Sequence, residues 1–527
     1  FVSFSPIQRV GGEKENRETT AMKIRNLVLL GFILLKFILQ YILIDPVYEL
    51  HRDEFLHLDQ ASHLAWGYTS VPPFTSWISW IILQLGNGVF WVKFFPALFG
   101  ALTLVVVWKT IEELKGGWFA LLLGAVSVVF STLIRLNMLY QPNSLDILAW
   151  TLLFFILLKF INSQNSKWLW YAGITFAFGF LNKYNIVFLL IGLLPSILIT
   201  EHRTIFRNKQ FYYAMGLAVL QVLPNLIWHY LNGFPVFKHL DELARTQLVN
   251  VNRFDFLKEQ LLFFMGSLFV ILAAFVAFVI YPSFRKYSIF GWSFLFIISL
   301  FVYLKAKGYY AIGLYPIFLA FGSVYLEQIL AGKWLKYLRP VAIILPLILF
   351  LPMLQIAFPN RTPQEIRQNP KQYKDFGLLR WEDGKEHDLP QDFADMQGWK
   401  ELAQKVDEAL ASIPDKEHTL LLCDNYGQAG AINYYSEIKN IGAVSMNADY
   451  INWFRLDKEI RNVILVQEAS DTDPERNKEK SMFETIERVG EITNPYAREK
   501  GTSIYVLKNA KTDINEILRK EIAERKH

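Results

Sequence analysis

Apolar segments long enough to cross a lipid bilayer recur along the first two thirds of this chain. Residues 27–44, 145–161 and 261–281 each approach the roughly 20 residues that a membrane-spanning α-helix needs. Water does not solvate helices that are apolar all round, so lipid or other helices must cover them. The composition, 53% hydrophobic and only 19% charged, agrees with this interpretation. The sequence therefore predicts a polytopic, all-α membrane domain.

We expect about eleven membrane spans in this domain. With Met22 in the cytoplasm, the short loops on the cytoplasmic side are basic, as between Arg203 and Lys209, which is what the positive-inside rule predicts. The long loops 45–87 and 231–259 then lie on the opposite, outer side, together with everything after the last span. The expected spans are residues 26–44, 88–108, 117–134, 144–161, 168–182, 186–200, 211–230, 260–281, 288–304, 309–330 and 339–358.

The two ends of the chain differ from the membrane domain, which we assign to residues 22–358. Residues 1–21 are polar and precede Met22, so we interpret them as a non-native or disordered leader. Residues 359–527 are rich in charge and predict a soluble α/β domain outside the membrane. In it, strand-like runs at 419–423, 463–467 and 503–507 alternate with helix-like runs at 399–410, 483–489 and 514–525.

Charge and cysteine content exclude several classes of function. The net charge of +5 comes mostly from basic residues in short loops, where they orient the spans, so we expect no nucleic-acid partner. The single cysteine, Cys423, excludes an internal disulfide and a thiolate metal cluster. We expect this side chain to pack as a small apolar group at the end of a strand.

The first outer loop contains the clearest candidate chemistry. Asp53 and Glu54 follow the first span closely, and paired carboxylates in this position suit a general base. Burial at the membrane interface should raise the pKa of Asp53 and make it a better base near neutral pH. The alternative is that both are solvated loop acids. His57 lies three residues after Glu54, so the two could bind a divalent metal from one helix face; an ordinary interfacial histidine is the alternative.

Further polar residues lie at the outer ends of other spans. Asp146 either serves the reaction or caps the N-terminus of the fourth span. Lysines are unexpected on the outer side, so Lys183, Lys305 and Lys307 are candidates for binding a phosphate; snorkelling to lipid headgroups is the alternative. The predicted substrate-lining residues at the same level are Arg52, Tyr68, Trp228, His229, Tyr309 and Tyr310.

Several of these segments resemble a known family, the bacterial dolichyl-phosphate-mannose–protein mannosyltransferase superfamily, which includes the lipid A aminoarabinose transferases. The resemblance extends over about residues 45–330, and the soluble segment from Cys423 to Ala431 looks like the soluble domain of bacterial members. The segments of the membrane domain that carry it are Arg52-Asp53-Glu54, Trp66-Gly67-Tyr68, Pro72-Pro73-Phe74, Asn182-Lys183-Tyr184, Pro224-Asn225-Leu226-Ile227-Trp228, Gly308-Tyr309-Tyr310 and Leu314-Tyr315-Pro316.

The resemblance implies a GT-C fold of family 39 type and inverting transfer of a sugar from a polyprenyl-phosphate donor. The acceptor would be a lipid, a glycan or a protein at the periplasmic face of the bacterial inner membrane. By motif position, Asp53 is at the reaction centre, with Glu54 beside it and Asp146 as the acid of the second loop. A divalent metal stays open, and no other cofactor is implied. No basic residue stands beside Pro72-Pro73, where aminoarabinose transferases typically carry a lysine, which argues against lipid A aminoarabinose transfer itself.

Two other classes of protein compete with this interpretation. A transporter or lipid flippase also has many spans, but it should carry acids or broken helices near the bilayer midplane, whereas the charges here lie at outer span ends. A structural assembly subunit with degenerate acids is the third possibility, and the intact Asp53 and Glu54 argue against it. We therefore predict a glycosyltransferase embedded in membrane lipids.

Overall fold

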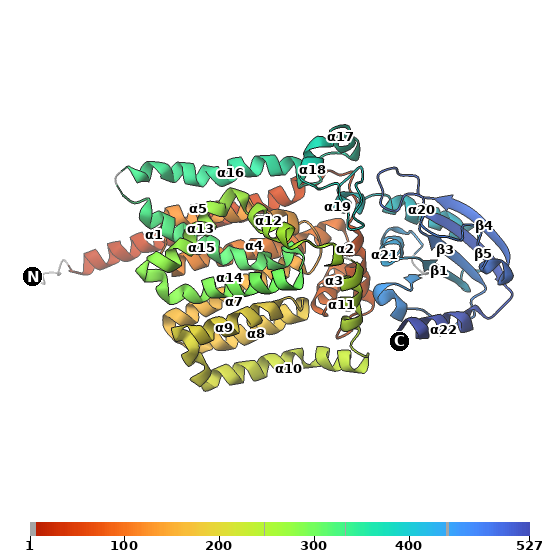
Figure 1. The fold of residues 1–527 in the computed structure, drawn as a ribbon, viewed down its shortest axis with the longest axis horizontal. Helices are drawn as coiled ribbons and strands as arrows, with labels where there is room; N and C mark the ends of the chain where they lie inside the picture. The colour runs from red at the N-terminus through yellow and green to blue at the C-terminus, as the bar shows by residue number, and fades with distance from the viewer. Residues whose placement is uncertain (1–6, 247, 333, 439–441, 527) are drawn as a thin grey trace, which may run out of the picture.

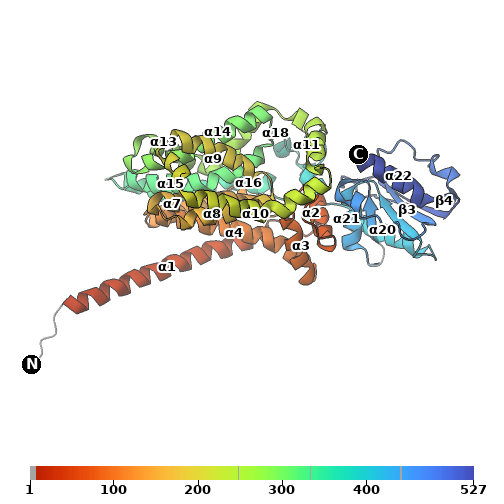
Figure 2. The ribbon, with the colours of Figure 1, turned by 90° about the horizontal axis from the view of Figure 1, so that it is seen from below.

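The computed structural model describes residues 7–246, 248–332, 334–438 and 442–526. A bundle of roughly parallel helices carries an α/β domain at one end (Figure 1). The first helix, α1 (Ile7–Ile42), extends past the opposite end of the bundle (Figure 2). Of the predicted leader, residues 1–6 lie outside the described residues, and residues 7–21 form the first part of α1.

Each predicted span coincides with a helix or with a bent helix pair. By length and composition, six helices of the described residues could cross a membrane, or up to eight if each bent pair is one span. The chain is thus a multi-pass membrane protein, and the finer count of eleven stays a prediction. The helices of the bundle are α1, α4 (Val89–Glu113), α5 (Trp118–Val129), α7 (Asn143–Ser163), α8 (Lys167–Asn182), α9 (Ile186–Ile199), α10 (Lys209–Leu231), α12 (Arg253–Leu262), α13 (Leu268–Ile280), α14 (Ser288–Leu304), α15 (Tyr315–Ile329) and α16 (Arg339–Ile356).

The spanning helices differ in how much protein covers them. In the span that ends with α15, 89% of the apolar window is buried inside the structure, whereas the span that contains α16 has 17% of its window buried. Helix α15 is therefore at the centre of the bundle and α16 at its periphery, where lipid must cover its apolar side chains.

Short helices cover the end of the bundle that faces the α/β domain (Figure 1): α2 (Arg52–Asp59), α3 (Phe74–Gln84), α6 (Leu133–Leu136) and α11 (Pro235–Thr246). A reciprocal capping pair fixes the start of α2. The Nδ1 atom of His51 accepts from the Asp53 amide at 3.2 Å, and the Glu54 carboxylate accepts from the His51 amide at 2.7 Å. Such a pair satisfies two of the amides that a helix start leaves without partners.

The C-terminal domain contains one mixed five-stranded sheet with the order β2-β1-β3-β5-β4. Strand β1 pairs in parallel with β2 and β3, whereas β5 pairs antiparallel with β3 and β4. Three short helices, α17 (Pro363–Gln368), α18 (Lys371–Asp375) and α19 (Gln391–Ala394), connect it to α16. The strands are β1 (Thr419–Cys423), β2 (Ala443–Ser445), β3 (Asn462–Gln467), β4 (Phe483–Glu491) and β5 (Ser503–Ala510).

The prediction of a helix at 483–489 is wrong, because this segment is part of β4. As an edge strand, β4 pairs only with β5 and buries few side chains, so it lacks the alternating apolar pattern of a half-buried strand. The strands predicted around 419–423, 463–467 and 503–507 and the helices around 399–410 and 514–525 are found in the structure.

The sheet has helices on both faces. Leu421 and Cys423 of β1 pack in one core with α20 (Trp399–Ala411) and α21 (Tyr426–Tyr435), and this core includes Phe55 of α2. Leu420 lies on the opposite face, in the core that includes α22 (Ile514–Lys526). Cys423 is buried and unpaired at the end of β1, as predicted. The first outer loop and the C-terminal domain thus share one hydrophobic core.

Candidate active site at the outer face

Asp53 lies in the first turn of α2, where three separate parts of the chain meet. The Nε2 atom of Gln141, from the second outer loop, donates to its Oδ2 at 2.9 Å. The hydroxyl of Tyr426, the first residue of α21, donates to its Oδ1 at 2.7 Å. The half-buried carboxylate therefore has one hydrogen-bond donor on each oxygen.

These surroundings hold the pKa of Asp53 below its ordinary value. Burial is the largest single influence and would raise the pKa, but His51, the Tyr426 hydroxyl and Arg52 together outweigh it. The expectation of a raised pKa is therefore wrong. Asp53 is ionised at neutral pH and is free to accept a proton.

Glu54, the next residue, is completely buried, and both of its carboxylate oxygens accept hydrogen bonds. The Nζ atom of Lys93 on α4 lies 2.7 Å from both carboxylate oxygens. The Tyr140 amide donates to Oε1 at 2.7 Å, in addition to the His51 amide on Oε2. This pairing ties α2 to α4 and to the second outer loop, which favours a structural role over the predicted catalytic one.

Asp146 lies in the first turn of α7, but its side chain does not cap that helix. Its Oδ1 accepts from the indole of Trp150 at 3.0 Å, and its Oδ2 accepts from Asn185 at 2.8 Å. Asn185 also donates to the carbonyl of Tyr310 at 3.0 Å. Asp146 thus orients the segment between α8 and α9, which carries Lys183.

Lys183 is held by an amide and two aromatic rings. Its Nζ donates to Oδ1 of Asn143 at 2.7 Å and lies 5.2 Å and 4.8 Å from the ring centroids of Tyr309 and Tyr310. No direct ion pair of Lys183 is found among the described residues, although the nearby carboxylate of Asp146 attracts its charge. Such a cation is suited to an anionic ligand.

A chain of hydrogen bonds joins Asp53 to Lys183. Gln141, which donates to Asp53, accepts from Asn143 through its Oε1 at 2.9 Å, and Asn143 in turn accepts from Lys183. The segment Gln141-Pro142-Asn143 therefore places one acid and one cation at a fixed separation at the end of the bundle that faces the α/β domain.

The other two predicted lysines differ from Lys183. Lys305 directly follows the last residue of α14 and has the left-handed backbone conformation, with φ of 53°. Lys307 forms an ion pair of 2.8 Å with Glu382, which comes from the connection between the two domains. An acidic partner was not expected for Lys307, because Glu382 is 75 residues away in sequence.

The predicted lining residues fall into two groups. Tyr309 and Tyr310 contact Lys183, and the guanidinium of Arg52 lies 4.4 Å from the ring centroid of Tyr426. The remaining three belong to the scaffold: Tyr68, Trp228 and His229.

Contacts of these three explain why they do not face an open site. Tyr68 is 2% exposed, and its hydroxyl donates to the carbonyl of His63 at 3.1 Å. The indole of Trp228 packs on Gly67, where a Cβ would approach it to 2.4 Å. His229 Nε2 lies 2.6 Å from the hydroxyl of Tyr184. Trp228 thus joins α10 to the first loop, and His229 joins α10 to the segment between α8 and α9.

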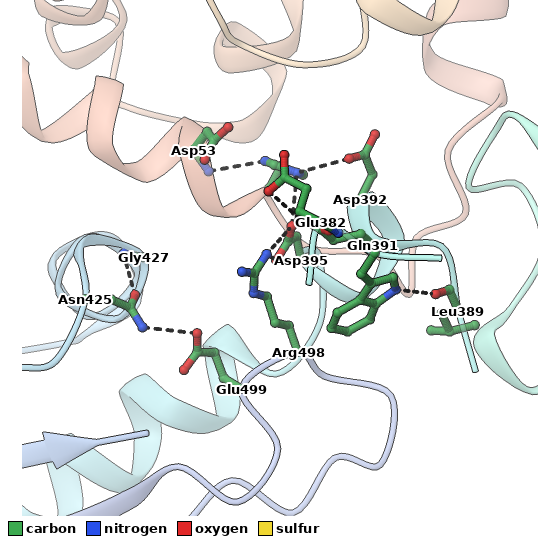
Figure 3. Close-up of polar contacts among 12 residues, drawn as sticks. Asp53, Glu382, Leu389, Gln391, Asp392, Asp395, Asn425, Gly427, Arg498 and Glu499 are labelled. Atoms are coloured by element: carbon green, nitrogen blue, oxygen red, sulfur yellow. Dashed lines mark hydrogen bonds and ion pairs between the residues drawn. The ribbon is translucent and has the colours of Figure 1, made fainter. Parts of the chain in front are cut away.

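Acids that sequence reasoning missed lie around Asp53 (Figure 3). Asp392 of α19 accepts from Nη2 of Arg135 at 2.9 Å, and Asp395 accepts from Nη1 of Arg498 at 3.2 Å. Sequence reasoning also did not identify Tyr426 as a site residue. These residues lie far along the sequence from Asp53. The signals in the sequence were the concentration of charge after residue 359 and, for Tyr426, its place in the segment from Cys423 to Ala431.

No group of three or more His, Cys, Asp and Glu side chains in the described part of the chain is arranged to hold a metal ion. His57 is buried with its ring edge toward Tyr140, at 6.3 Å between centroids. Burial lowers the pKa of His57. Glu54, its predicted partner, is bonded to Lys93 instead.

Comparison with solved structures identifies the class to which this architecture belongs. ArnT from Cupriavidus metallidurans bound to undecaprenyl phosphate matches with a TM-score of 0.59, over 91% of this chain and 98% of that chain. The apo state of the same enzyme matches with a TM-score of 0.56. The sequence identity is 13% in both cases, so the match shows the fold, an ArnT-like GT-C fold.

Sequence comparison points to the particular family. Residues 70–228 match the family described as dolichyl-phosphate-mannose-protein mannosyltransferase. Lipid A galacturonosyltransferase RgtD from Rhizobium johnstonii is 23% identical over 239 residues, which are 43% of this chain and 47% of that relative. The chain thus matches about half the length of this curated relative. The resemblance to this family of membrane glycosyltransferases is therefore confirmed.

Proposed function

We propose that this protein transfers a sugar from a polyprenyl-phosphate carrier to a lipid, glycan or protein acceptor, with Asp53 as the general base. The observation that carries the proposal is the hydrogen-bonded chain from Asp53 through Gln141 and Asn143 to Lys183. It joins an ionised acid to a lysine that forms no direct ion pair among the described residues, and glycosyl transfer from a phosphate needs both groups.

In the proposed reaction, Asp53 and Lys183, at the two ends of this chain of hydrogen bonds, each have one role. The acceptor hydroxyl attacks the anomeric carbon while Asp53 takes its proton. The bond between the anomeric carbon and the phosphate oxygen breaks, and Lys183 stabilises the negative charge on the departing phosphate. Attack opposite the leaving phosphate inverts the configuration at the anomeric carbon. Lys305, Lys307 and Arg52 are further candidates for contacts with the donor.

We infer the orientation from the sequence and the arrangement of the helices. Helices α1, α5 and α8 would cross the membrane with the others and bring the total to about eleven spans. Asp53 and the C-terminal domain would then face the periplasm of a bacterial inner membrane. A reporter fused to the C-terminus should be active only outside the cytoplasm, and activity inside would contradict this topology.

Purified protein in lipid, incubated with a panel of polyprenyl-phosphate sugars and candidate acceptors, tests the function directly. We expect free polyprenyl phosphate and glycosylated acceptor in equal amounts, detected by mass spectrometry. Movement of intact donor lipid across the bilayer without sugar transfer would instead support the flippase alternative.

A further inference from the structure

The segment Asn425-Tyr426-Gly427, with Gly430 one turn later, has a function that the soluble domain alone does not require. It starts α21, the helix that lies between the sheet and α2 (Figure 1). Asn425 holds this helix start within the C-terminal domain, and the other three residues contact the loop of the membrane domain that carries α2.

Asn425 fixes the first turn of α21. Its Oδ1 accepts from the amides of Gly427 and Gln428 at 2.9 Å and 3.1 Å. Its Nδ2 donates to Glu499 at 3.1 Å and to Glu468 at 2.6 Å, so the cap is anchored to the rest of the domain (Figure 3). An anchored cap gives the following residue, Tyr426, a defined position.

The two glycines allow α21 to approach α2 closely. A Cβ on Gly427 would lie 2.5 Å from Cγ of Arg52, and a Cβ on Gly430 would lie 2.6 Å from both Cβ of Phe55 and the Tyr450 hydroxyl. Real side-chain carbons do not come this near to their neighbours. Any larger residue at these positions would therefore push the two helices apart.

This close approach places the Tyr426 hydroxyl within hydrogen-bond distance of the Asp53 carboxylate. The hydroxyl donates to Oδ1 at 2.7 Å, and the ring lies 4.4 Å from the guanidinium carbon of Arg52. We infer that Tyr426 is a positioning residue for the proposed glycosyl transfer, so that the C-terminal domain completes the active site of the membrane domain. The inference rests on the proposed function.

In this inference, Tyr426 acts by fixing the orientation of the Asp53 carboxylate. With Gln141 on one oxygen and Tyr426 on the other, the carboxylate cannot rotate, and each oxygen keeps a free lone pair for the acceptor proton. A hydrogen bond to the ionised form also stabilises that form. Loss of the hydroxyl should therefore both misalign Asp53 and make it hold a proton at higher pH.

Tyr426→Phe tests the inference, because it keeps the ring over Arg52 and removes only the hydroxyl. We expect kcat to fall about 10- to 150-fold, the range for loss of one hydrogen bond to a charged group, with little change in KM for the donor. The acidic limb of the pH–rate profile should move to higher pH. Gly427→Ala, which keeps the hydroxyl but displaces it, should move the limb in the same direction.

Tyr450→Phe is the matched control. Tyr450 also belongs to the C-terminal domain, and its hydroxyl donates to an aspartate of α2, Asp59, at 2.6 Å. This variant removes the same kind of bond between the same two parts and should leave kcat at neutral pH close to that of the wild type. Equal effects of the two variants would mean that Tyr426 serves only docking, and would overturn the inference.

The two proposals can be separated by the same experiment. Transfer that requires Asp53 but proceeds with a normal rate and pH profile in Tyr426→Phe overturns this inference alone. Absence of transfer by the wild-type protein with every donor overturns the proposed function and this inference with it.

Discussion

Asp53 and Glu54 are neighbours in sequence, but their carboxylates receive hydrogen bonds from different parts of the molecule. Asp53 is bonded to Gln141 and Tyr426, and Glu54 is bonded to Lys93, Tyr140 and His51. Each carboxylate oxygen of Asp53 keeps one lone pair that can accept a further hydrogen bond. The carboxylate of Glu54 already accepts hydrogen bonds from the ammonium of Lys93 and from two backbone amides. Paired acids in a sequence can therefore divide into one that can still accept a proton and one that holds the helix in place.

Asp53→Asn should cut turnover by roughly 10²–10⁴-fold, because it removes the basic oxygen and keeps the size of the side chain. Expression and donor binding should stay close to wild type, since Asn can still accept from Tyr426 or Gln141. Release of polyprenyl phosphate over time is the measurement. Near-normal turnover of a well-folded variant would place the reaction centre elsewhere.

Glu54→Gln should instead reduce stability. The change leaves the buried ammonium of Lys93 without its counter-charge, and breaking a buried pair on one side typically costs about 3–5 kcal/mol. Thermal unfolding in detergent measures the effect. The double variant Glu54→Gln with Lys93→Met should recover part of the loss, and a single variant as stable as wild type would contradict the structural role.

Lys183→Met should weaken donor binding by about 1.5–3 kcal/mol, or roughly 10- to 150-fold, because a charge-assisted contact to phosphate is lost. The matched control is Lys109→Met. Lys109 is paired with Glu112 at 2.8 Å near the end of α4, on the side predicted to be cytoplasmic. Binding of a polyprenyl phosphate to both variants is compared with wild type, and equal losses would remove Lys183 from the donor site.

The docking of the C-terminal domain should depend on pH through Asp59. Its Oδ2 accepts from Tyr450 at 2.6 Å and from Asn433 at 2.7 Å, and burial raises its pKa to about 7, from 3.8 in an exposed chain. The folded state therefore binds a proton that the unfolded state releases between pH values of about 4 and 7. Over this window the contribution of Asp59 to stability falls as pH rises.

Asp59→Asn should remove this contribution to the pH dependence. Thermal unfolding between pH 4 and pH 8, with Asp241→Asn as a control on an exposed acid, measures it. Identical pH dependence in wild type and Asp59→Asn would show that Asp59 titrates normally.

The membrane helices could be predicted because their signal is local. Runs of apolar residues such as 145–161 and 288–304 identify spans without knowledge of their neighbours, and α7 and α14 lie where they were expected. The outer lysine Lys183 was identified by a similar local argument, its unusual position at a span end.

The pairing of side chains across the outer face could not be predicted, because it depends on distant parts of the chain. The engagement of Glu54 depends on Lys93, 39 residues away, and the contact of Asp53 depends on Tyr426, 373 residues away. The sign of the pKa shift of Asp53 follows from these partners. The strand β4 was assigned wrongly because an edge strand carries little of the buried pattern that sequence analysis uses.

The separation of 373 residues between Asp53 and Tyr426 has a consequence for biosynthesis. At about 5–20 residues per second, ribosomes need roughly 20–75 s to make the chain between them. During that time α2 has already been made, but its two aspartates lack the tyrosine hydroxyls that reach them in the finished protein. A nascent chain of this kind therefore cannot assemble its Asp53 site until the last third has been made, which delays activity until the whole polypeptide is in place.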